Sequence, residues 1–230
     1  MKTYLINLDR NPERLEFMRG QLERLGMDFE RFPAVWGKGL SEDERKVGFS
    51  RTRSFIAAGK RLSDAEIGVA MSHVGCCRRM VEAEEPYALV LEDDVVLSDG
   101  FRGALSRVEA FVSPGRPQLV LLSGYGVPDA ESLPEEIRSV KSAWCADAYV
   151  LTLPAAKLIL QANSPVITVA DSFKRWRRRF GLELFRALPA TARQDDTTFA
   201  SENLVLPKSG WFVRNTMKLL DWIVWRVSGR

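Results

Sequence analysis

The sequence has little histidine and little cysteine. Its 230 residues include one histidine, His73, and three cysteines, Cys76, Cys77 and Cys145. One histidine excludes any chemistry that needs two imidazoles, and three cysteines, two of them adjacent, cannot form a fully paired disulfide framework. Their spacing does not match a zinc site. We therefore expect reduced thiols in a cytoplasmic protein, with Cys76 and Cys77 packed in a core or an interface.

Long apolar runs are missing as well. No stretch of 18 apolar residues occurs, which predicts that no helix spans a membrane. The amino-terminal MKTYLINLDR lacks the apolar segment of a signal peptide. Hydrophobic residues make up 46% of the chain, as in an ordinary globular protein with a sizeable core.

The charge is small but unevenly distributed. Lys and Arg number 33 against 30 Asp and Glu, for a net charge of +3. Residues 171–230 hold 12 basic and 6 acidic side chains, so the preceding part of the chain is slightly acidic. This distribution suggests a site that needs carboxylates, followed by a segment that faces an anionic surface.

The hydrophobic pattern predicts alternating strands and helices. A short apolar strand over 3–8 is followed by Pro12, which favours the first turn of a helix, and by Gly26 as the helix terminator. With a second strand over 29–35, this order indicates an α/β protein with a parallel sheet. Further strands are expected at 87–91, 119–122 and 144–152, and further helices from Ser63 or Asp64 and from Pro154.

The segment 37–61 is polar, basic and rich in Gly and Ser. This composition predicts a mobile loop or lid, with a weakly patterned helix as the alternative. No internal repeat or low-complexity tract interrupts the chain.

Three adjacent acids, Glu92, Asp93 and Asp94, follow the strand expected at 87–91. Adjacent carboxylates repel one another and are costly to bury, so a cation that neutralises them is favoured. Mg²⁺ and Mn²⁺ prefer oxygen ligands, and open α/β sheets bind ligands at the carboxyl ends of their strands. In an extended backbone Glu92 and Asp94 point to the same side and form a pair for one ion. The alternative is a solvated turn, and similar clusters also occur in phosphotransfer receivers and metal-dependent phosphatases.

Four ordered segments carry a family resemblance. They are 4–14 (YLINLDRNPER), 29–35 (FERFPAV), 62–68 (LSDAEIG, leading to Ser72 and His73) and 89–95 (LVLEDDV), with weaker matches at 148–151, 155–157 and Gln194. Together they resemble glycosyltransferase family 25, which contains bacterial lipooligosaccharide galactosyl- and glucosyltransferases related to collagen-modifying enzymes. The resemblance covers about residues 3 to 200.

The resemblance implies a GT-A-like nucleotide-sugar-binding fold, with a mostly parallel central sheet flanked by helices. It also implies a UDP-sugar donor and a divalent cation, Mn²⁺ or Mg²⁺, held by Glu92 and Asp94. The family inverts the anomeric centre, which requires a base, and Asp171 is the first candidate, followed by Asp147 and Glu66. The residues implied for donor binding are Asn7, Asp9, Arg10, Arg14, Ser72, His73, Asp93 and Gln194.

The chain departs from the family pattern at three places. Trp36-Gly37 stands where the family often has Asp-Gly, and Cys145-Ala146-Asp147 replaces the small Gly-Thr pair before Tyr149. The late aspartate, Asp171, lies several residues beyond Pro165-Val166. These departures point to a different choice of donor or acceptor.

Two basic or amphipathic segments lie toward the carboxyl end. Residues 174–179 (KRWRRR) hold five cations, and 212–227 form a wide apolar face on a helical wheel. We predict a glycosyltransferase domain over 1–205 and an amphipathic tail over 206–230 that contacts an anionic membrane surface. The alternatives are a solvated helix face and an ordinary packed terminal helix. A short basic patch without a recognised module does not favour a nucleic-acid partner.

The resulting hypothesis is an inverting hexosyltransferase. It moves galactose or glucose from a UDP-sugar to a lipopolysaccharide, lipooligosaccharide or other surface glycan, and its acceptor is lipid-linked or phosphorylated. We expect it in the cytoplasm, peripheral on the inner face of the cell membrane. Two alternatives stay open: an inactive, membrane-docked family member that acts as a binding module, and a metal-dependent phosphotransfer protein.

Overall fold

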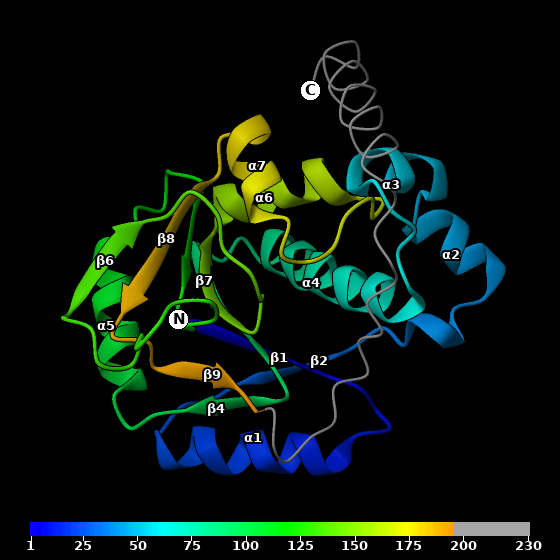
Figure 1. The fold of residues 1–230 in the computed structure, drawn as a ribbon. Helices are drawn as coiled ribbons and strands as arrows, with labels where there is room; N and C mark the ends of the chain where they lie inside the picture. The colour runs from blue at the N-terminus through cyan, green and yellow to red at the C-terminus, as the bar shows by residue number, and fades with distance from the viewer. Residues whose placement is uncertain (196–230) are drawn as a thin grey trace.

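The structure of the protein is a computed structural model that describes residues 1–195. Its centre is a seven-stranded sheet in the order β2-β1-β3-β7-β5-β8-β6 (Figure 1). In this sheet β7 and β6 run opposite to the other five strands, so the expected mostly parallel α/β sheet is confirmed. The strands are β1 (Lys2–Asn7), β2 (Glu30–Pro33), β3 (Tyr87–Glu92), β5 (Gln118–Leu121), β6 (Glu136–Ser139), β7 (Ala148–Thr152) and β8 (Glu183–Leu188).

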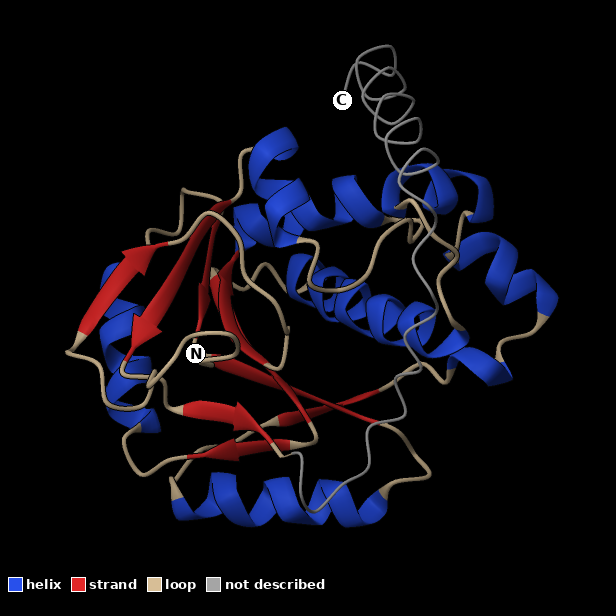
Figure 2. Ribbon diagram, in the orientation of Figure 1, coloured by secondary structure: helices blue, strands red, loops and turns tan. Residues whose placement is uncertain are grey.

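Helices cover both faces of the sheet (Figure 2). One face packs against α4 (Asp64–Glu82), α6 (Leu153–Asn163) and α7 (Phe173–Phe180), and the other against α1 (Pro12–Arg24) and α5 (Phe101–Phe111). The small sheet of β4 (Val95–Leu97) and β9 (Ala192–Gln194) joins the second layer. Strand residues alternate between the layers: Tyr4 and Ile6 lie in the first core, and Leu5 lies in the second. This layered arrangement is the one expected of a GT-A-like fold.

The first helix forms as the sequence predicts. Pro12 occupies its first turn, Met18 and Leu22 are fully buried, and Gly26 follows its end with φ of +63°. Cys76 and Cys77 are buried in α4, which confirms their place in a core.

The expectation of an irregular loop over 37–61 is wrong, and its helical alternative is right. The segment contains a short 3₁₀ helix, η1 (Gly37–Gly39), and two helices, α2 (Glu42–Gly48) and α3 (Arg51–Ala58). Ser41 and Glu44 form a capping box at the start of α2. Local capping stabilises helices here that hydrophobic periodicity alone does not reveal.

The fourth helix positions one wall of the site. Ser63 is its N-cap and forms a capping box with Glu66, as the predicted start requires. The strand expected over 144–152 begins only at Ala148, because Cys145 has φ of +69° and breaks the extended backbone. Strands β6 and β8 are not evident in the hydrophobic pattern.

The carboxyl ends of β1 and β3 and the amino end of the antiparallel β7 meet at one edge of the sheet. Asn7, Glu92 and Asp147 therefore lie near one another although they are far apart in sequence. No helix within residues 1–195 has the length and apolar composition needed to cross a bilayer. The predicted tail over 206–230 lies outside the described residues, as does the end of the predicted 1–205 domain.

Candidate functional site

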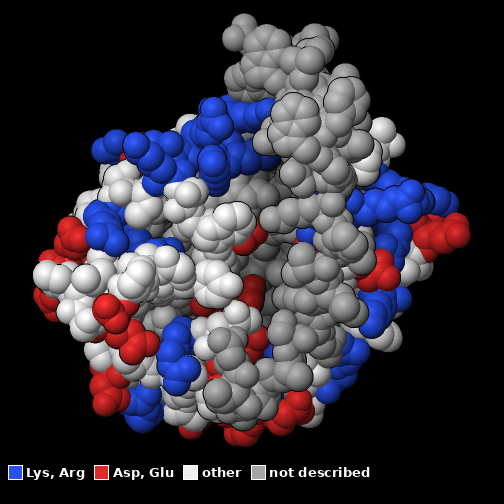
Figure 3. All heavy atoms as spheres, in the orientation of Figure 1, with Lys and Arg blue, Asp and Glu red and all other residues white. Residues whose placement is uncertain are grey.

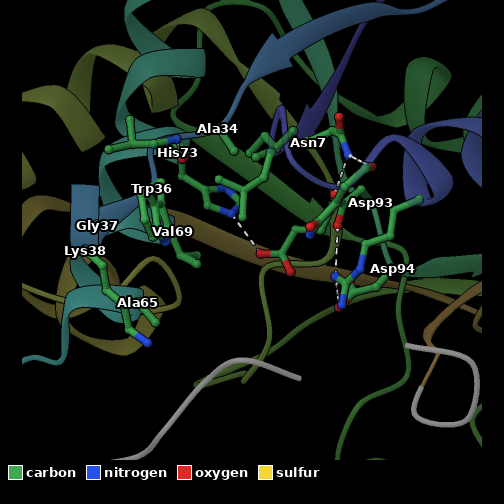
Figure 4. Close-up of a pocket in the computed structure, with 17 residues that line it drawn as sticks. Asn7, Ala34, Trp36, Gly37, Lys38, Ala65, Val69, His73, Asp93 and Asp94 are labelled. Atoms are coloured by element: carbon green, nitrogen blue, oxygen red, sulfur yellow. Dashed lines mark hydrogen bonds and ion pairs between the residues drawn. The ribbon is translucent and has the colours of Figure 1, made fainter. Parts of the chain in front are cut away.

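A pocket opens at this edge of the sheet, between the ends of β1 and β3, the start of α1, one side of α4 and the segment 34–38 (Figure 4). Asn7, Arg14, Ser72, His73 and the acids 92–94 line it, and these are seven of the thirteen side chains that the sequence singles out. Ligands bind at such strand ends in open α/β sheets. We call it the donor pocket, after the role that the resemblance implies for these residues.

Asp93 is held by two side chains. The Asn7 amide donates to its Oδ2 at 2.7 Å, and Arg14 Nη1 donates to its Oδ1 at 3.2 Å. Burial raises the pKa of Asp93, while the bonds from Asn7 and Arg14 act in the opposite direction. Asn7 is itself fixed, because its Oδ1 accepts a bond from Arg31 Nε at 2.9 Å. Asn7 therefore orients the acidic cluster.

Asp94 is hydrogen-bonded through one of its two carboxylate oxygens. Its Oδ2 accepts bonds from Arg14 at 3.4 Å and from Gln194 at 3.3 Å. Its Oδ1 is buried and has no hydrogen-bond partner among residues 1–195. Burial and the neighbouring charge of Glu92 raise the pKa of Asp94 to about 7. A carboxylate in this position favours the approach of a cation or a proton.

Glu92 is oriented by a buried histidine. His73 Nε2 lies 2.9 Å from Glu92 Oε1, and His73 Nδ1 lies 2.8 Å from the Tyr149 hydroxyl. Figure 4 shows the His73 ring pointing into the pocket from α4. Burial raises the pKa of Tyr149 well above its usual value, so its hydroxyl stays protonated and can donate to Nδ1. In a neutral ring, these two partners favour the tautomer that carries its proton on Nε2 and donates it to the Glu92 carboxylate.

The segment 34–38, which lines one side of the pocket, packs unusually close to α4. Ser72 accepts the Val35 N–H at 2.8 Å and donates to the Gly68 carbonyl at 2.8 Å. A Cβ on Gly37 would lie 1.7 Å from the Asp64 carbonyl oxygen, and one on Gly68 would lie 2.4 Å from that of Val35. Only glycine allows this approach. Ser72 thus shapes the pocket with its hydroxyl engaged by the backbone.

Cations and an aromatic ring surround the mouth of the pocket. Lys38 and Arg14 line it, and the Arg10 guanidinium lies 5.0 Å from the centre of the Trp36 ring. Trp36 is 47% exposed. Asp9 points elsewhere and pairs with Arg31. This edge of the pocket combines a flat apolar surface with positive charge.

The acids alone do not enclose a metal ion. Within residues 1–195, no three His, Cys, Asp or Glu side chains are grouped so that they could hold one. Asp94 Oδ1, which has no partner within residues 1–195, is nevertheless a hard oxygen ligand, and the neighbouring Glu92 disfavours a further unpaired negative charge there. Mg²⁺ is commonly bound by one or two carboxylates together with substrate phosphates. The donor set fits an ion that is shared with an anionic ligand.

A second pocket adjoins the donor pocket and shares Glu92 and Val69 with it. Asp171, Glu66 and Gln194 also line this second pocket. Asp171 accepts the Cys145 N–H on Oδ2 at 3.2 Å, and burial raises its pKa. The structure thus brings two of the three candidate bases beside the acidic cluster.

The other candidate bases are more constrained. Glu66 receives the Ser63 N–H on Oε2 at 2.8 Å and pairs with Lys60 through Oε1. Asp147 is completely buried, and burial raises its pKa to about 6. Its backbone carbonyl accepts the Glu92 N–H at 2.8 Å, so it lies directly behind the acidic cluster.

Sequence reasoning missed several residues of this site. Arg31 fixes Asn7 and Asp9, Tyr149 fixes His73, and Lys38 lines the donor pocket. Arg31 and Tyr149 both lie inside segments that matched the family, so the resemblance offered a signal for them. Lys38 follows the divergent Trp36-Gly37 and had no such signal.

Comparisons with known proteins agree on one family. The family model described as "Glycosyltransferase family 25 (LPS biosynthesis protein)" matches residues 1–174. A "Glycosyltransferase 25 family member" of Drosophila pseudoobscura pseudoobscura is 33% identical over 172 residues, which cover 70% of this chain and 27% of the relative. The "Inactive glycosyltransferase 25 family member 3" of Homo sapiens is 29% identical over 72% of this chain and 29% of its own length. The chain spans about a quarter of the length of these relatives.

Among solved structures, the crystal structure of the galactosyltransferase LgtC in complex with donor and acceptor sugar analogs aligns with 85% of this chain and 68% of its own. The alignment has 15% sequence identity and a TM-score of 0.39.

Proposed function

The chain belongs to glycosyltransferase family 25, and from this membership we propose that it is an inverting, UDP-sugar-dependent hexosyltransferase. It moves galactose or glucose to a lipopolysaccharide, lipooligosaccharide or other surface-glycan acceptor. The observation that carries the proposal is the position of Glu92, which lies on the wall shared by two adjoining pockets. A transferase needs two such sites side by side, one for the donor and one for the acceptor.

The donor pocket suits a nucleoside diphosphate. Arg14 and Lys38 offer positive charge to the phosphates, and the exposed Trp36 ring offers a flat surface to the base. The acids are oriented by hydrogen bonds to Asn7, His73 and Gln194. Ser72 accepts the Val35 N–H and so fixes the segment 34–38. Arg10 packs over Trp36, whereas Asp9 is not among the residues that line the donor pocket and pairs with Arg31.

A divalent cation, Mn²⁺ or Mg²⁺, would be held by Asp94 and Glu92 together with the phosphates of the donor. When bound, it supplies positive charge to the departing diphosphate. The protein contributes the orientation of the carboxylates, through His73 on Glu92 and through Arg14 and Gln194 on Asp94.

The transfer itself uses a base from the second pocket. The acceptor hydroxyl oxygen forms a bond to the anomeric carbon as the bond from that carbon to the diphosphate oxygen breaks, and UDP leaves with the bonding electrons. The hydroxyl proton passes to Asp171, whose raised pKa makes it a better proton acceptor than an exposed aspartate. Asp147 and Glu66 are weaker candidates for the base. Asp147 has no exposed surface, and both carboxylate oxygens of Glu66 already have partners.

The test is UDP release from UDP-galactose and UDP-glucose, with Mn²⁺ or with EDTA. We expect metal-dependent release that Asp94→Ala abolishes while the variant stays folded, since removing one carboxylate relieves repulsion. Asp99→Ala is the matched control, because the Asp99 side chain is 93% exposed and lies outside both pockets. Near-normal turnover in Asp94→Ala would refute the assignment of the acidic cluster.

Two alternatives give different results in the same assay. A relative whose name includes "inactive" favours a binding module, which would bind a UDP-sugar without releasing UDP. A phosphotransfer protein would label Asp93 or Asp94 with phosphate and needs a lysine at a later strand end. The lysine that lines the donor pocket, Lys38, lies in η1 instead.

We also propose that the protein docks on an anionic membrane surface in the cytoplasm. Basic side chains gather over α7 (Figure 3), where Phe173 and Trp176 anchor the helix and Lys174 and Arg178 are exposed. Sedimentation with vesicles of phosphatidylglycerol and phosphatidylcholine tests this. Lys174→Glu with Arg178→Glu should reduce the bound fraction, and deletion of 211–230 should release the protein if the predicted tail contributes.

A further inference from the structure

Two aromatic rings are exposed at the second pocket. Tyr125 is 56% exposed and Trp144 is 64% exposed, and both line this pocket. The two come from different loops, yet a Cβ placed on Gly126 would lie 4.0 Å from Trp144 Cδ1, so the loops are in contact. Single exposed apolar residues are common on protein surfaces, but two exposed rings side by side at a pocket indicate a binding surface.

The backbone beneath both rings is fixed. Cys145 adopts φ of +69°, a conformation that is unfavourable for a residue with a side chain, and its N–H donates to Asp171. The Tyr125 carbonyl accepts a bond from Arg186 Nη2 at 3.3 Å, and Arg186 is only 4% exposed. A strained residue and a buried arginine thus hold the rings at the rim, which indicates preorganisation for a ligand.

The polar lining restricts the chemistry of that ligand. Glu66, Glu92, Asp171 and Gln194 line the pocket, and no lysine or arginine is among its lining residues in the described chain. Carboxylates and an amide accept and donate bonds to hydroxyl groups, but the carboxylates repel phosphate. A pyranose ring has hydroxyl groups at its edge and an apolar C–H face that can pack on an aromatic ring.

We propose that the second pocket binds an uncharged sugar ring of a glycan acceptor, with the apolar face of the ring packed on Trp144 and Tyr125. The inference rests on the proposed transferase function and narrows it. A phosphate on the acceptor, where present, lies outside this pocket. The shared wall at Glu92 and Val69 brings the hydroxyl of this ring next to the donor.

Binding is tested first, because it needs no turnover. Saturation-transfer NMR with lactose and the methyl glycosides of galactose, glucose and N-acetylglucosamine should show contact with the wild-type protein. Trp144→Ala and Tyr125→Ala should weaken the signal at least about tenfold, as the loss of an aromatic anchor does. Trp144→Phe should retain most of it. Val47→Ala is the control, since Val47 is 81% exposed and lies outside both pockets.

Kinetics then separate this proposal from the transferase assignment. Trp144→Ala should raise the acceptor KM about tenfold and change the UDP-sugar KM less than about twofold. An acceptor KM within twofold of the wild type in both alanine variants overturns the aromatic platform while the transferase assignment stands. A wild-type protein that binds these sugars but releases no UDP refutes the transferase and keeps the pocket. Binding of none of the four sugars, or tighter binding of galactose 6-phosphate or a hydroxyl-bearing peptide, overturns the proposal.

Discussion

His73 Nε2 and Glu92 Oε1 lie 2.9 Å apart, and the far nitrogen of the same ring faces the Tyr149 hydroxyl at 2.8 Å. The ring is 4% exposed, so neither bond competes strongly with water. His73 touches the acid on the wall between the two pockets. Its role in the proposed reaction is to position Glu92.

His73→Phe should reduce transfer about tenfold to a hundredfold, because groups that orient a metal-binding carboxylate have effects of this size. His73→Gln places an amide nitrogen near the position of Nε2 and should restore much of the activity. The measurement is kcat and the Mn²⁺ concentration for half-maximal UDP release. A purely structural role would lower the melting temperature of both variants equally and leave the Mn²⁺ dependence unchanged.

Arg14 bridges Asp93 and Asp94 from α1, with a side chain that is 13% exposed. Arg14→Met should destabilise the protein by about 3 kcal/mol at pH 8, because it leaves buried carboxylates without their cation. The loss should be smaller at pH 5. Without Arg14 the pKa of Asp94, already about 7, rises further, so at pH 5 this carboxyl is protonated and its loss of a cation costs less. Thermal unfolding at both pH values measures this.

Arg19→Met is the matched control for Arg14. Arg19 pairs with Glu16 on the same helix, and both side chains are largely exposed. Exposed pairs contribute about 0–1 kcal/mol, so its melting temperature should hardly change. Equal losses in Arg14→Met at pH 5 and pH 8 would show that packing, and not charge, accounts for the effect.

Much of the fold follows from local signals. The start of α1 at Pro12, the start of α4 at Ser63 and the strand before Glu92 each combine a hydrophobic pattern with a capping residue or a charge boundary. The sequence predicts the helices α2 and α3 only as the alternative to a loop, because few of their side chains are buried and they carry little periodicity. Strand β8 was missed because its Arg186 is buried, which no alternation rule predicts.

The site was predictable where it depends on one segment and not where it depends on several. The acids 92–94 are evident in the sequence, but their partners come from β1, α1, α4 and β9. Which of two nearby carboxylates stays ionised depends on burial, and burial is a property of the whole fold. The exposed Trp144 lies next to Cys145, whose positive φ no hydrophobic pattern predicts.

Gly68→Ala should damage the donor pocket specifically. Its Cβ would lie 2.4 Å from the Val35 carbonyl oxygen, so the segment 34–38 must move away from α4. We expect a higher KM for the UDP-sugar, with a lower melting temperature.

Gly20→Ala in α1 is the matched control, because a Cβ on Gly20 would have no atom within 4 Å and so displaces nothing. That change should raise stability by about 0.5–1 kcal/mol, as alanine favours helix. A donor KM that rises in neither variant would contradict the role of the close approach.

Asp147 gives the clearest dependence on pH. Its folded-state pKa is about 6, above the ordinary value of 3.8, so between these values the folded state holds a proton that the unfolded chain has lost. The free energy of unfolding therefore falls as pH rises through this window, and the full penalty is present above about pH 7. Asp147→Asn keeps the Oδ1 that accepts the Ala148 N–H and cannot ionise.

The variant should match the wild type near pH 4 and be more stable at pH 8. The expected gain is about 3 kcal/mol, the free energy that corresponds to the difference between the folded-state pKa of about 6 and the ordinary value of 3.8. Thermal unfolding with EDTA at pH 4, 6 and 8 measures this gain, which should show as several degrees at pH 8. Asp99→Asn, with its exposed side chain, should show no such trend. A constant gap between Asp147→Asn and the wild type at all three pH values would mean that Asp147 is ionised or neutral in both states alike. In that case Asp147 would not contribute to the pH dependence of the free energy of unfolding.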